Sequence, residues 1–273
     1  MELKDAVTIV TGGASGIGRA ICHAFAAEGA TVVAVDLNAD GVAETAREIG
    51  GVAMTANVGA EEDVRRVVEG TIARFGRVDL MFSNAGIERH AAQGASGADL
   101  LEEDANWEAS WAVNTMAHVY AARAVLPHML ERGEGYICST ASAAGLLTSL
   151  GAVSYAVTKH GALAFAEFLA MTYGDDGIRV SCLCPQGVKT PMLQASAQWA
   201  HLGDYLMAGA LQPEEVADAV VEAIREETFL ILPHPEVREY VRRKGDDHDR
   251  WLRGMRRLWK NMQEMAAGEK PAG

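Results

Sequence analysis

The amino-acid sequence predicts a single α/β domain, a doubly wound parallel sheet of about seven strands with helices on both faces. Short β-branched runs alternate with helical stretches through residues 1–233. Strands joined by helices pair in parallel through right-handed crossovers, which place helices on both sheet faces. The strands are also apolar almost without interruption, as is typical of strands buried on both faces. No Pro/Ser-rich linker divides residues 1–233, so we expect one domain there.

The predicted strands are short runs rich in β-branched residues, bounded by glycines or polar loops. The first, "AVTIVT", ends at the glycines that follow it, and the second, "ATVVAVD", ends at an acid. The fourth, "RVDLMFSNAG", ends at Gly86. The seven runs are 6–11, 30–36, 51–58, 77–86, 135–140, 178–185 and 229–232.

The predicted helices fill the gaps between these strands. Some are charged and amphipathic, such as 61–75, whereas 153–173 is mostly apolar. The helices are expected at 18–29, 40–49, 61–75, 106–132, 153–173 and after Pro213. Residues 234–273 are expected to add a C-terminal helical extension rather than a second domain.

The composition limits the classes of protein to consider. The chain has 273 residues, of which 49 % are hydrophobic and 22 % charged, a globular composition. Its net charge of −13 argues against nucleic acid as a partner. The basic stretch 238–260 is either a solvated helical face or a subunit contact. No run of about 18 residues is apolar enough to span a bilayer, and the N-terminus lacks the features of a signal peptide. We therefore expect a cytoplasmic protein with no membrane partner.

The cysteines do not indicate a metal site. Cys22, Cys138, Cys182 and Cys184 contain no C-x-x-C pair. As neighbours in one predicted strand, Cys182 and Cys184 suit neither a relaxed disulfide nor a zinc site without further ligands. We expect reduced, buried thiols and no bound metal.

A glycine-rich stretch, "TGGASGIG" (11–18), lies between the first strand and the first helix. Glycines there allow a tight turn and let backbone N–H groups approach a pyrophosphate at a helix N-terminus. Asp36 ends the second strand at the spacing expected for a carboxylate that binds a ribose 2′-hydroxyl, although it could also be a turn or capping residue. A 2′-phosphate would meet like charge at Asp36, and Leu37 offers no compensating arginine. NAD is therefore predicted over NADP.

A tyrosine and a lysine lie four residues apart in "SYAVTKHGAL" (154–163). This spacing places Tyr155 and Lys159 on one helix face. A free phenol is a poor base at neutral pH, but a neighbouring cation lowers its pKa. The pair could thus be a tuned acid/base catalyst. The alternative is a half-exposed helix with a snorkelling lysine.

Together these motifs resemble those of the short-chain dehydrogenase/reductase family, in its shorter core-type branch. The resemblance covers roughly residues 5–232 and implies a Rossmann-type fold. The motifs stand in family order: "TGGASGIG", "SNAG" (83–86), Asn114, Ser142, Tyr155-x-x-x-Lys159 and "PQGVKT" (185–190). Two departures from the family pattern matter most: Gln186 replaces a usual glycine and Cys184 a common asparagine.

The resemblance implies catalytic roles for four residues. Tyr155 would be the general acid/base. Lys159 would lower the pKa of the phenol and bind the nicotinamide ribose. Ser142 would hold the substrate oxygen, and Asn114 would bind a water that links Lys159 to solvent. Taken singly, Ser142 could be a turn hydroxyl and Asn114 a helix-kink amide.

The resemblance also implies a set of cofactor contacts. The glycine loop would hold the pyrophosphate, and later segments would bind the adenine, the riboses and the carboxamide. Asn57 stands where the family commonly has aspartate. The implied residues are Gly12, Ser15, Gly16, Ile17, Gly18, Asp36, Leu37, Asn57, Val58, Asn84, Ala85, Gly86, Tyr155, Lys159, Pro185, Gly187, Val188 and Thr190.

The function expected from these motifs is hydride transfer between NAD(H) and a secondary alcohol or ketone. A lid over about 190–212 carries many apolar side chains, which favours a bulky apolar substrate unless they pack only into the fold or a subunit contact. The expected substrate-side residues are Gln186, His90, Met192, Trp199, Leu202 and Tyr205. The alternative functions are those of a non-catalytic NAD-binding sensor or scaffold and of an epimerase or dehydratase. The resemblance also implies a homo-oligomer, with a tetramer favoured.

Overall fold

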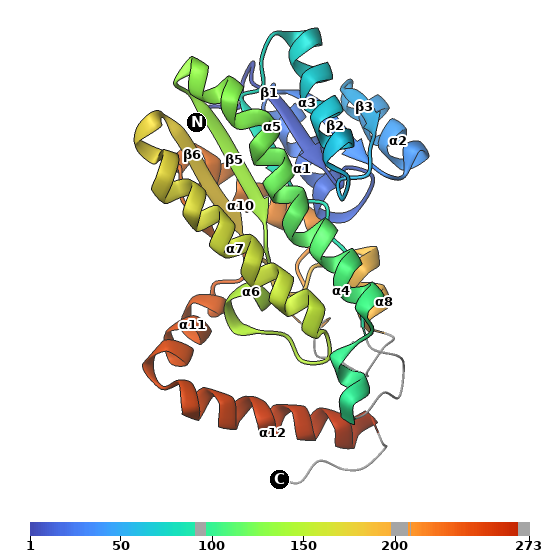
Figure 1. The fold of residues 1–273 in the computed structure, drawn as a ribbon, viewed down its shortest axis with the longest axis vertical. Coiled ribbons are helices and arrows are strands. Elements are labelled where there is room, and N and C mark those ends of the chain that lie inside the picture. Colours follow the sequence, from blue (N-terminus) through green and yellow to red (C-terminus); the bar gives the residue numbers. More distant parts are fainter. Residues whose placement is uncertain (91–96, 198–206, 208, 267–273) are drawn as a thin grey trace.

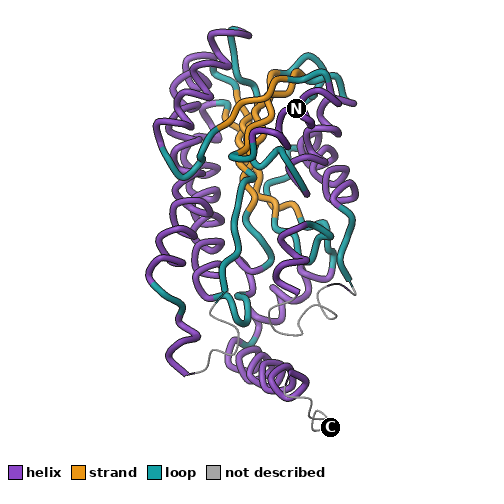
Figure 2. The backbone as a smooth tube through the Cα atoms, turned by 90° about the vertical axis from the view of Figure 1, so that its right-hand side faces the viewer, coloured by secondary structure: helices purple, strands orange, loops and turns teal. Residues whose placement is uncertain are grey.

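The computed structural model describes residues 1–90, 97–197, 207 and 209–266. Its centre is a seven-stranded parallel sheet of order β3-β2-β1-β4-β5-β6-β7. Figure 2 shows helices on both sides of the strands. The predicted doubly wound α/β fold is confirmed. The strands are β1 Val7–Thr11, β2 Thr31–Asp36, β3 Val52–Thr55, β4 Leu80–Ser83, β5 Gly135–Thr140, β6 Ile178–Leu183 and β7 Leu230–Ile231.

The helices follow the predicted alternation, and a short helix after β5 is an addition to it (Figure 1). Three short turns, η1 Gly97–Leu101, η2 Ala112–Met116 and η3 Gly174–Asp176, join them. The helices are α1 Gly16–Ala27, α2 Ala39–Ile49, α3 Glu61–Phe75, α4 Asp104–Trp111, α5 Ala117–Arg132, α6 Ala144–Leu147, α7 Val153–Tyr173, α8 Pro191–Ala197, α10 Pro213–Glu226, α11 Glu236–Asp246 and α12 His248–Ala266.

Two hydrophobic layers hold the helices to the sheet. Alternate strand residues face opposite sides, so Ile9 packs with α3, α5 and α7, whereas Val10 packs with α1 and α10. All five residues of β1 are buried. This burial on both faces explains why the strands read as continuous apolar runs in the sequence.

The predicted helix 106–132 is continuous but contains one irregular turn. α4 and α5 are joined by a single π-helical turn, η2, which contains Asn114. Such turns re-aim side chains within a helix and are frequent at functional sites. The sequence pattern predicted the helix but not this turn.

The C-terminal residues form two helices beyond the last strand. α11 packs on α6, and Val237 joins a small apolar cluster with Ala143 and Leu147. Trp251 of α12 contacts the same cluster. Figure 1 shows α12 across the end of the molecule opposite the N-terminus. In the described part of the chain, no helix is long and apolar enough to cross a membrane.

Candidate active site

The candidate site is a cleft of about 330 Å³ at the carboxyl ends of the strands. In this sheet the strand order reverses between β1 and β4, and ligands of open α/β sheets bind at such a switch point. The cleft brings together most of the residues predicted from sequence. Those in its lining are Gly12, Ser15, Gly16, Ile17, Gly18, Asp36, Asn84, Ala85, Gly86, Ser142, Tyr155, Lys159, Pro185, Gln186, Gly187, Val188, Thr190 and Met192.

Other predicted residues are not in this lining. Leu37 is 71 % exposed. Asn57 is exposed in the loop between β3 and α3, where its side chain accepts a hydrogen bond from the Gly59 N–H at 3.0 Å. Val58, His90 and Asn114 are also outside the lining. Trp199, Leu202 and Tyr205 lie outside the described residues.

The glycine loop is shaped by close backbone approach. Gly12 and Gly16 have positive φ angles of 74° and 53°, which favour glycine. A Cβ on Gly18 would lie 2.1 Å from the carbonyl oxygen of Gly12, and one on Gly16 would lie 2.9 Å from Thr190 Cγ2. The loop therefore leaves the α1 N-terminus uncovered by side chains, which fits a pyrophosphate bound there.

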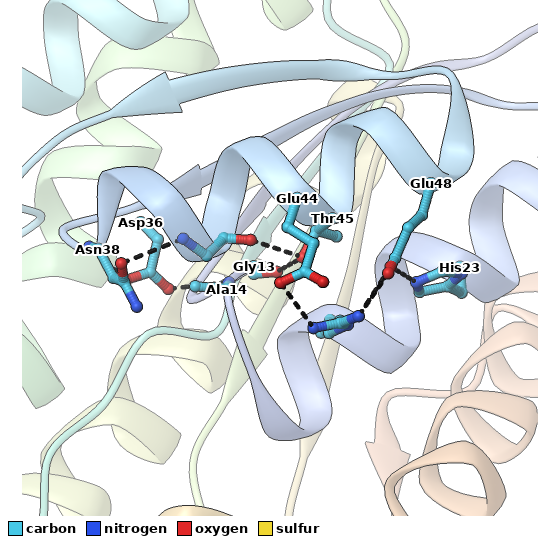
Figure 3. Close-up of polar contacts among 10 residues, drawn as sticks. Gly13, Ala14, His23, Asp36, Asn38, Glu44, Thr45 and Glu48 are labelled. Atoms are coloured by element: carbon cyan, nitrogen blue, oxygen red, sulfur yellow. Dashed lines mark hydrogen bonds and ion pairs between the residues drawn. The ribbon is translucent and has the colours of Figure 1, made fainter.

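Asp36 makes the turn contacts that one of its two predicted roles requires (Figure 3). Its Oδ2 accepts from the Ala14 N–H at 3.0 Å and its Oδ1 from the Asn38 N–H at 2.9 Å. The carboxylate thus fixes the glycine loop to the end of β2, while also lining the cleft. The cap of α2 is Asn38, whose side chain accepts from the Gly41 N–H at 3.1 Å.

Asn84 joins three strand ends beneath the cleft. Its Nδ2 donates to the Thr11 carbonyl at 3.0 Å, and its Oδ1 accepts from Thr140 Oγ1 at 3.0 Å. The Thr11 hydroxyl in turn accepts from the N–H groups of Asn84 and Ala85. The Asn84 side chain is therefore committed to the fold, and only its flank faces the cleft.

Tyr155 and Lys159 project from α7 toward the same cleft as Ser142, which follows β5. Lys159 is 3 % exposed, and its Nζ donates to the Thr140 carbonyl oxygen at 2.9 Å. Burial lowers the pKa of Lys159 to about 8, against the opposing effect of Cys182, Cys184 and Glu88.

The pKa of Tyr155 is raised in this structure. Burial is the main cause and the charge of Glu88 the next, whereas a hydrogen bond with Ser142 acts in the opposite direction. The expectation that Lys159 lowers the phenol pKa is therefore not met by the protein alone. The Lys159 ammonium lies 5.7 Å from the Tyr155 ring centroid and is bonded to Thr140.

Asn114 is buried and anchors the loop after β4. Its Oδ1 accepts from the Ile87 N–H at 2.8 Å, and its Nδ2 donates to the Ile87 carbonyl at 2.8 Å and to Thr158 Oγ1 at 3.2 Å. Both amide hydrogens are thus used within the protein. A water expected to bind Asn114 could therefore only donate a hydrogen bond to the second lone pair of Oδ1.

The sequence analysis missed several residues of the cleft, among them Glu88, and it missed His234, which supports the cleft from outside its lining. Glu88 lines the cleft and accepts a hydrogen bond from Ser196 of α8. His234 is buried, and its Nδ1 accepts a hydrogen bond from the Gln186 N–H at 3.2 Å. Its Nε2 lies 3.1 Å from the Gly187 carbonyl oxygen. Both contacts are hydrogen bonds when the ring hydrogen is on Nε2. Glu88 could have been noticed because it follows "SNAG" in a loop at the carboxyl end of a strand. His234 carries no local signal.

The sequence profile described as short chain dehydrogenase matches residues 6–201, which include the glycine loop and the Tyr155/Lys159 pair. The chain belongs to the short-chain dehydrogenase family. It is 34 % identical over 254 residues to 1-deoxy-11-beta-hydroxypentalenate dehydrogenase from Streptomyces exfoliatus, covering 90 % of each chain. It is also 35 % identical over 226 residues to 2-(R)-hydroxypropyl-CoM dehydrogenase from Xanthobacter autotrophicus, covering 79 % of this chain and 89 % of that one.

A solved short-chain dehydrogenase/reductase from Burkholderia phymatum, in complex with NAD, has a TM-score of 0.81 to this structure. The two are 25 % identical, and the match covers 100 % of this chain and 98 % of that one. The resemblance inferred from the motifs is thereby confirmed. So is the prediction of an oxidoreductase that acts on a CH–OH group, because the family model and both of these named relatives are dehydrogenases.

Proposed function

We propose that this short-chain dehydrogenase uses NAD(H) to interconvert a neutral, largely apolar secondary alcohol and its ketone. The observation that carries the proposal is the meeting of Ser142, Tyr155 and Lys159 in the cleft that also contains the glycine loop and Asp36. A non-catalytic sensor or scaffold would not need this acid/base group beside a cofactor cleft.

The residues present fit NAD. The bare α1 N-terminus can hold the pyrophosphate, and the Asp36 carboxylate has lone pairs left after its two backbone bonds to accept from a ribose hydroxyl. The same charge disfavours a 2′-phosphate, and exposed Leu37 offers nothing to neutralise it. When bound, NAD⁺ supplies the acceptor for the hydride that leaves the carbinol carbon.

The protein's own groups would manage the proton and the oxygen. Tyr155 would take the hydroxyl proton as the carbonyl forms, and return it when the ketone is reduced. Ser142, which lines the cleft with Tyr155, would hold the reacting oxygen as charge develops. Lys159 would bind the ribose beside the nicotinamide and keep a positive charge near the phenol.

The substrate side of the cleft supports an apolar substrate. Met192 and Leu193 of α8 contribute to the wall of the cleft that contains Tyr155. Ligand sites are mostly apolar with a few placed polar groups. We propose that α8 is part of the lid expected at about 190–212.

The proposed activity is tested by NADH formation with a panel of secondary alcohols at matched concentrations. We expect turnover with NAD⁺ to exceed turnover with NADP⁺, and cyclic apolar alcohols to exceed small hydroxy acids in kcat/KM. Absence of NADH formation with every secondary alcohol, in protein shown to bind NADH, would contradict the proposal.

We also propose that the enzyme is a homo-oligomer, with a tetramer favoured by the family resemblance. Phe168 and Met171 of α7 are 52 % and 79 % exposed, and Trp111 of α4 is exposed as well. Large exposed apolar side chains are typical of subunit contacts. Light scattering on the purified protein at micromolar concentration tests this, and a monomer mass would contradict it.

A further inference from the structure

An acidic side chain lies beside the catalytic group. Glu88 lines the cleft together with Ser142, Tyr155 and Lys159, and its side chain is 17 % exposed. A carboxylate is seldom buried this far without a partner or a function. None of the catalytic roles described above uses Glu88.

The position of Glu88 is fixed by α8. The Ser196 hydroxyl donates to Glu88 Oε2 at 2.6 Å, and Ser196 is itself 6 % exposed. His90 contacts both members of this pair: its Nε2 lies 3.2 Å from Ser196 Oγ and 3.8 Å from Glu88 Oε1. The bond to Ser196 holds the carboxylate against the wall of the cleft that a substrate would approach.

The hydrogen bond from Ser196 does not by itself require a charge on Glu88. A neutral amide could accept the same hydrogen bond from Ser196 and join α8 to the loop after β4 equally well. The charge has an electrostatic consequence in the cleft: after burial, it is the next cause that raises the pKa of Tyr155, and it also opposes the lowering of the pKa of Lys159. Its field therefore reaches the reacting groups.

We infer that Glu88 is a specificity-determining residue that rejects substrates with an anionic group near the reacting carbinol and favours those with a hydrogen-bond donor there. The inference rests on the proposed function and narrows its substrate class. A carboxylate can only accept hydrogen bonds. A second hydroxyl close to the carbinol would supply a donor to Glu88, whereas a carboxylate there would meet like charge.

The test compares three substrates that share one ring: cyclohexanol, cyclohexane-1,2-diol and 2-hydroxycyclohexanecarboxylate. In the wild-type enzyme we expect kcat/KM to be highest for the diol and at least about tenfold lower for the hydroxy acid than for cyclohexanol. In Glu88→Gln the penalty on the hydroxy acid should shrink at least about tenfold, and the advantage of the diol should shrink with it. Glu44→Gln, which removes one charge from the exposed face of α2, should leave both ratios unchanged.

Ser196→Ala separates charge from position, because it removes the bond to α8 but leaves Glu88 charged. We expect Ser196→Ala to keep most of the rejection of the hydroxy acid. Equal loss of rejection in Ser196→Ala and Glu88→Gln would overturn the inference, since the contact with α8 would then be the cause.

A binding measurement keeps the inference independent of turnover. Calorimetric titration measures the Kd of each protein for cyclohexanecarboxylate and for cyclohexanol. We expect the affinity for the carboxylate, relative to that for cyclohexanol, to be at least about tenfold higher in Glu88→Gln than in the wild type. Unchanged relative affinity would overturn the role of Glu88, even if the enzyme oxidises alcohols. NADH formation that fails for all three alcohols, with the expected shift in affinity, would instead count against the proposed function alone.

Discussion

The Nζ atom of Lys159 donates a 2.9 Å hydrogen bond to the carbonyl oxygen of Thr140, and this bond ties the catalytic helix α7 to the end of β5. The amine is buried, and burial disfavours its charged form. The pKa of Lys159 therefore falls to about 8. The same bond fixes the amine near Gly86, where an added Cβ would lie 3.2 Å from it. Lys159 is thus positioned to bind a ligand, but without a ligand its buried charge lowers the free energy of unfolding.

That cost gives a prediction for Lys159→Met. The folded pKa of about 8 lies below the ordinary value of 10.5, so below pH 8 the charge is buried in full and the penalty is largest. It is relieved between pH 8 and 10.5, where only the unfolded state stays protonated. The free energy of unfolding of the wild type, relative to Lys159→Met, should therefore rise by about 3 kcal/mol across this window. Denaturant titrations of both proteins without cofactor at several pH values measure it, and a relative stability that falls with pH would contradict the assignment.

The selection of NAD depends on the charge of Asp36. Asp36→Asn keeps an oxygen that can accept from one of the two backbone N–H groups, but removes the repulsion toward a 2′-phosphate. We expect the NAD/NADP ratio of kcat/KM to fall at least about tenfold in Asp36→Asn, and further when Leu37→Arg is added. Asp40→Ala, which removes a nearby exposed charge in the first turn of α2, is the control. A wild type that already prefers NADP would show that Asp36 does not have this role.

The segment from Pro185 to Gly187 depends on His234. His234→Ala would leave the Gln186 N–H and the Gly187 carbonyl without their partner, at a cost of about 1–3 kcal/mol of unfolding free energy. Because this segment lines the cleft, the KM for NAD should rise as well. His248→Ala, at an exposed histidine, should change stability by less than about 0.5 kcal/mol. Wild-type stability and KM in His234→Ala would show that the segment holds its position unaided.

The sequence predicted this site where the chemistry depends on residues close together in the chain. The Tyr155/Lys159 pair follows from helix periodicity, and the glycine loop from the strand and helix on either side of it. The direction of the Lys159 amine depends on how α7 packs on β5, which no local pattern encodes. Glu88 and Ser196 are 108 positions apart, and His234 and Gln186 are 48 apart, so these pairs appear only once the chain is folded.

Asn114 shows a different limit of the sequence. Its position in the family order pointed to a water-binding role, and the alternative was an amide at a helix kink. The structure places it in a π-helical turn with both amide hydrogens bonded to Ile87 and Thr158. A π turn inserts one residue into a regular helix, and apolar periodicity along 106–132 does not reveal where that insertion falls.

The central claim is that the Tyr155 hydroxyl transfers the proton in an NAD-dependent oxidation. Tyr155→Phe removes that oxygen and little else, so NADH binding measured by fluorescence should stay within about threefold of wild type. The kcat for alcohol oxidation should fall about 10²–10⁴-fold, the usual contribution of a general acid/base. Turnover by Tyr155→Phe within tenfold of the wild type, with NADH binding intact, would contradict the account.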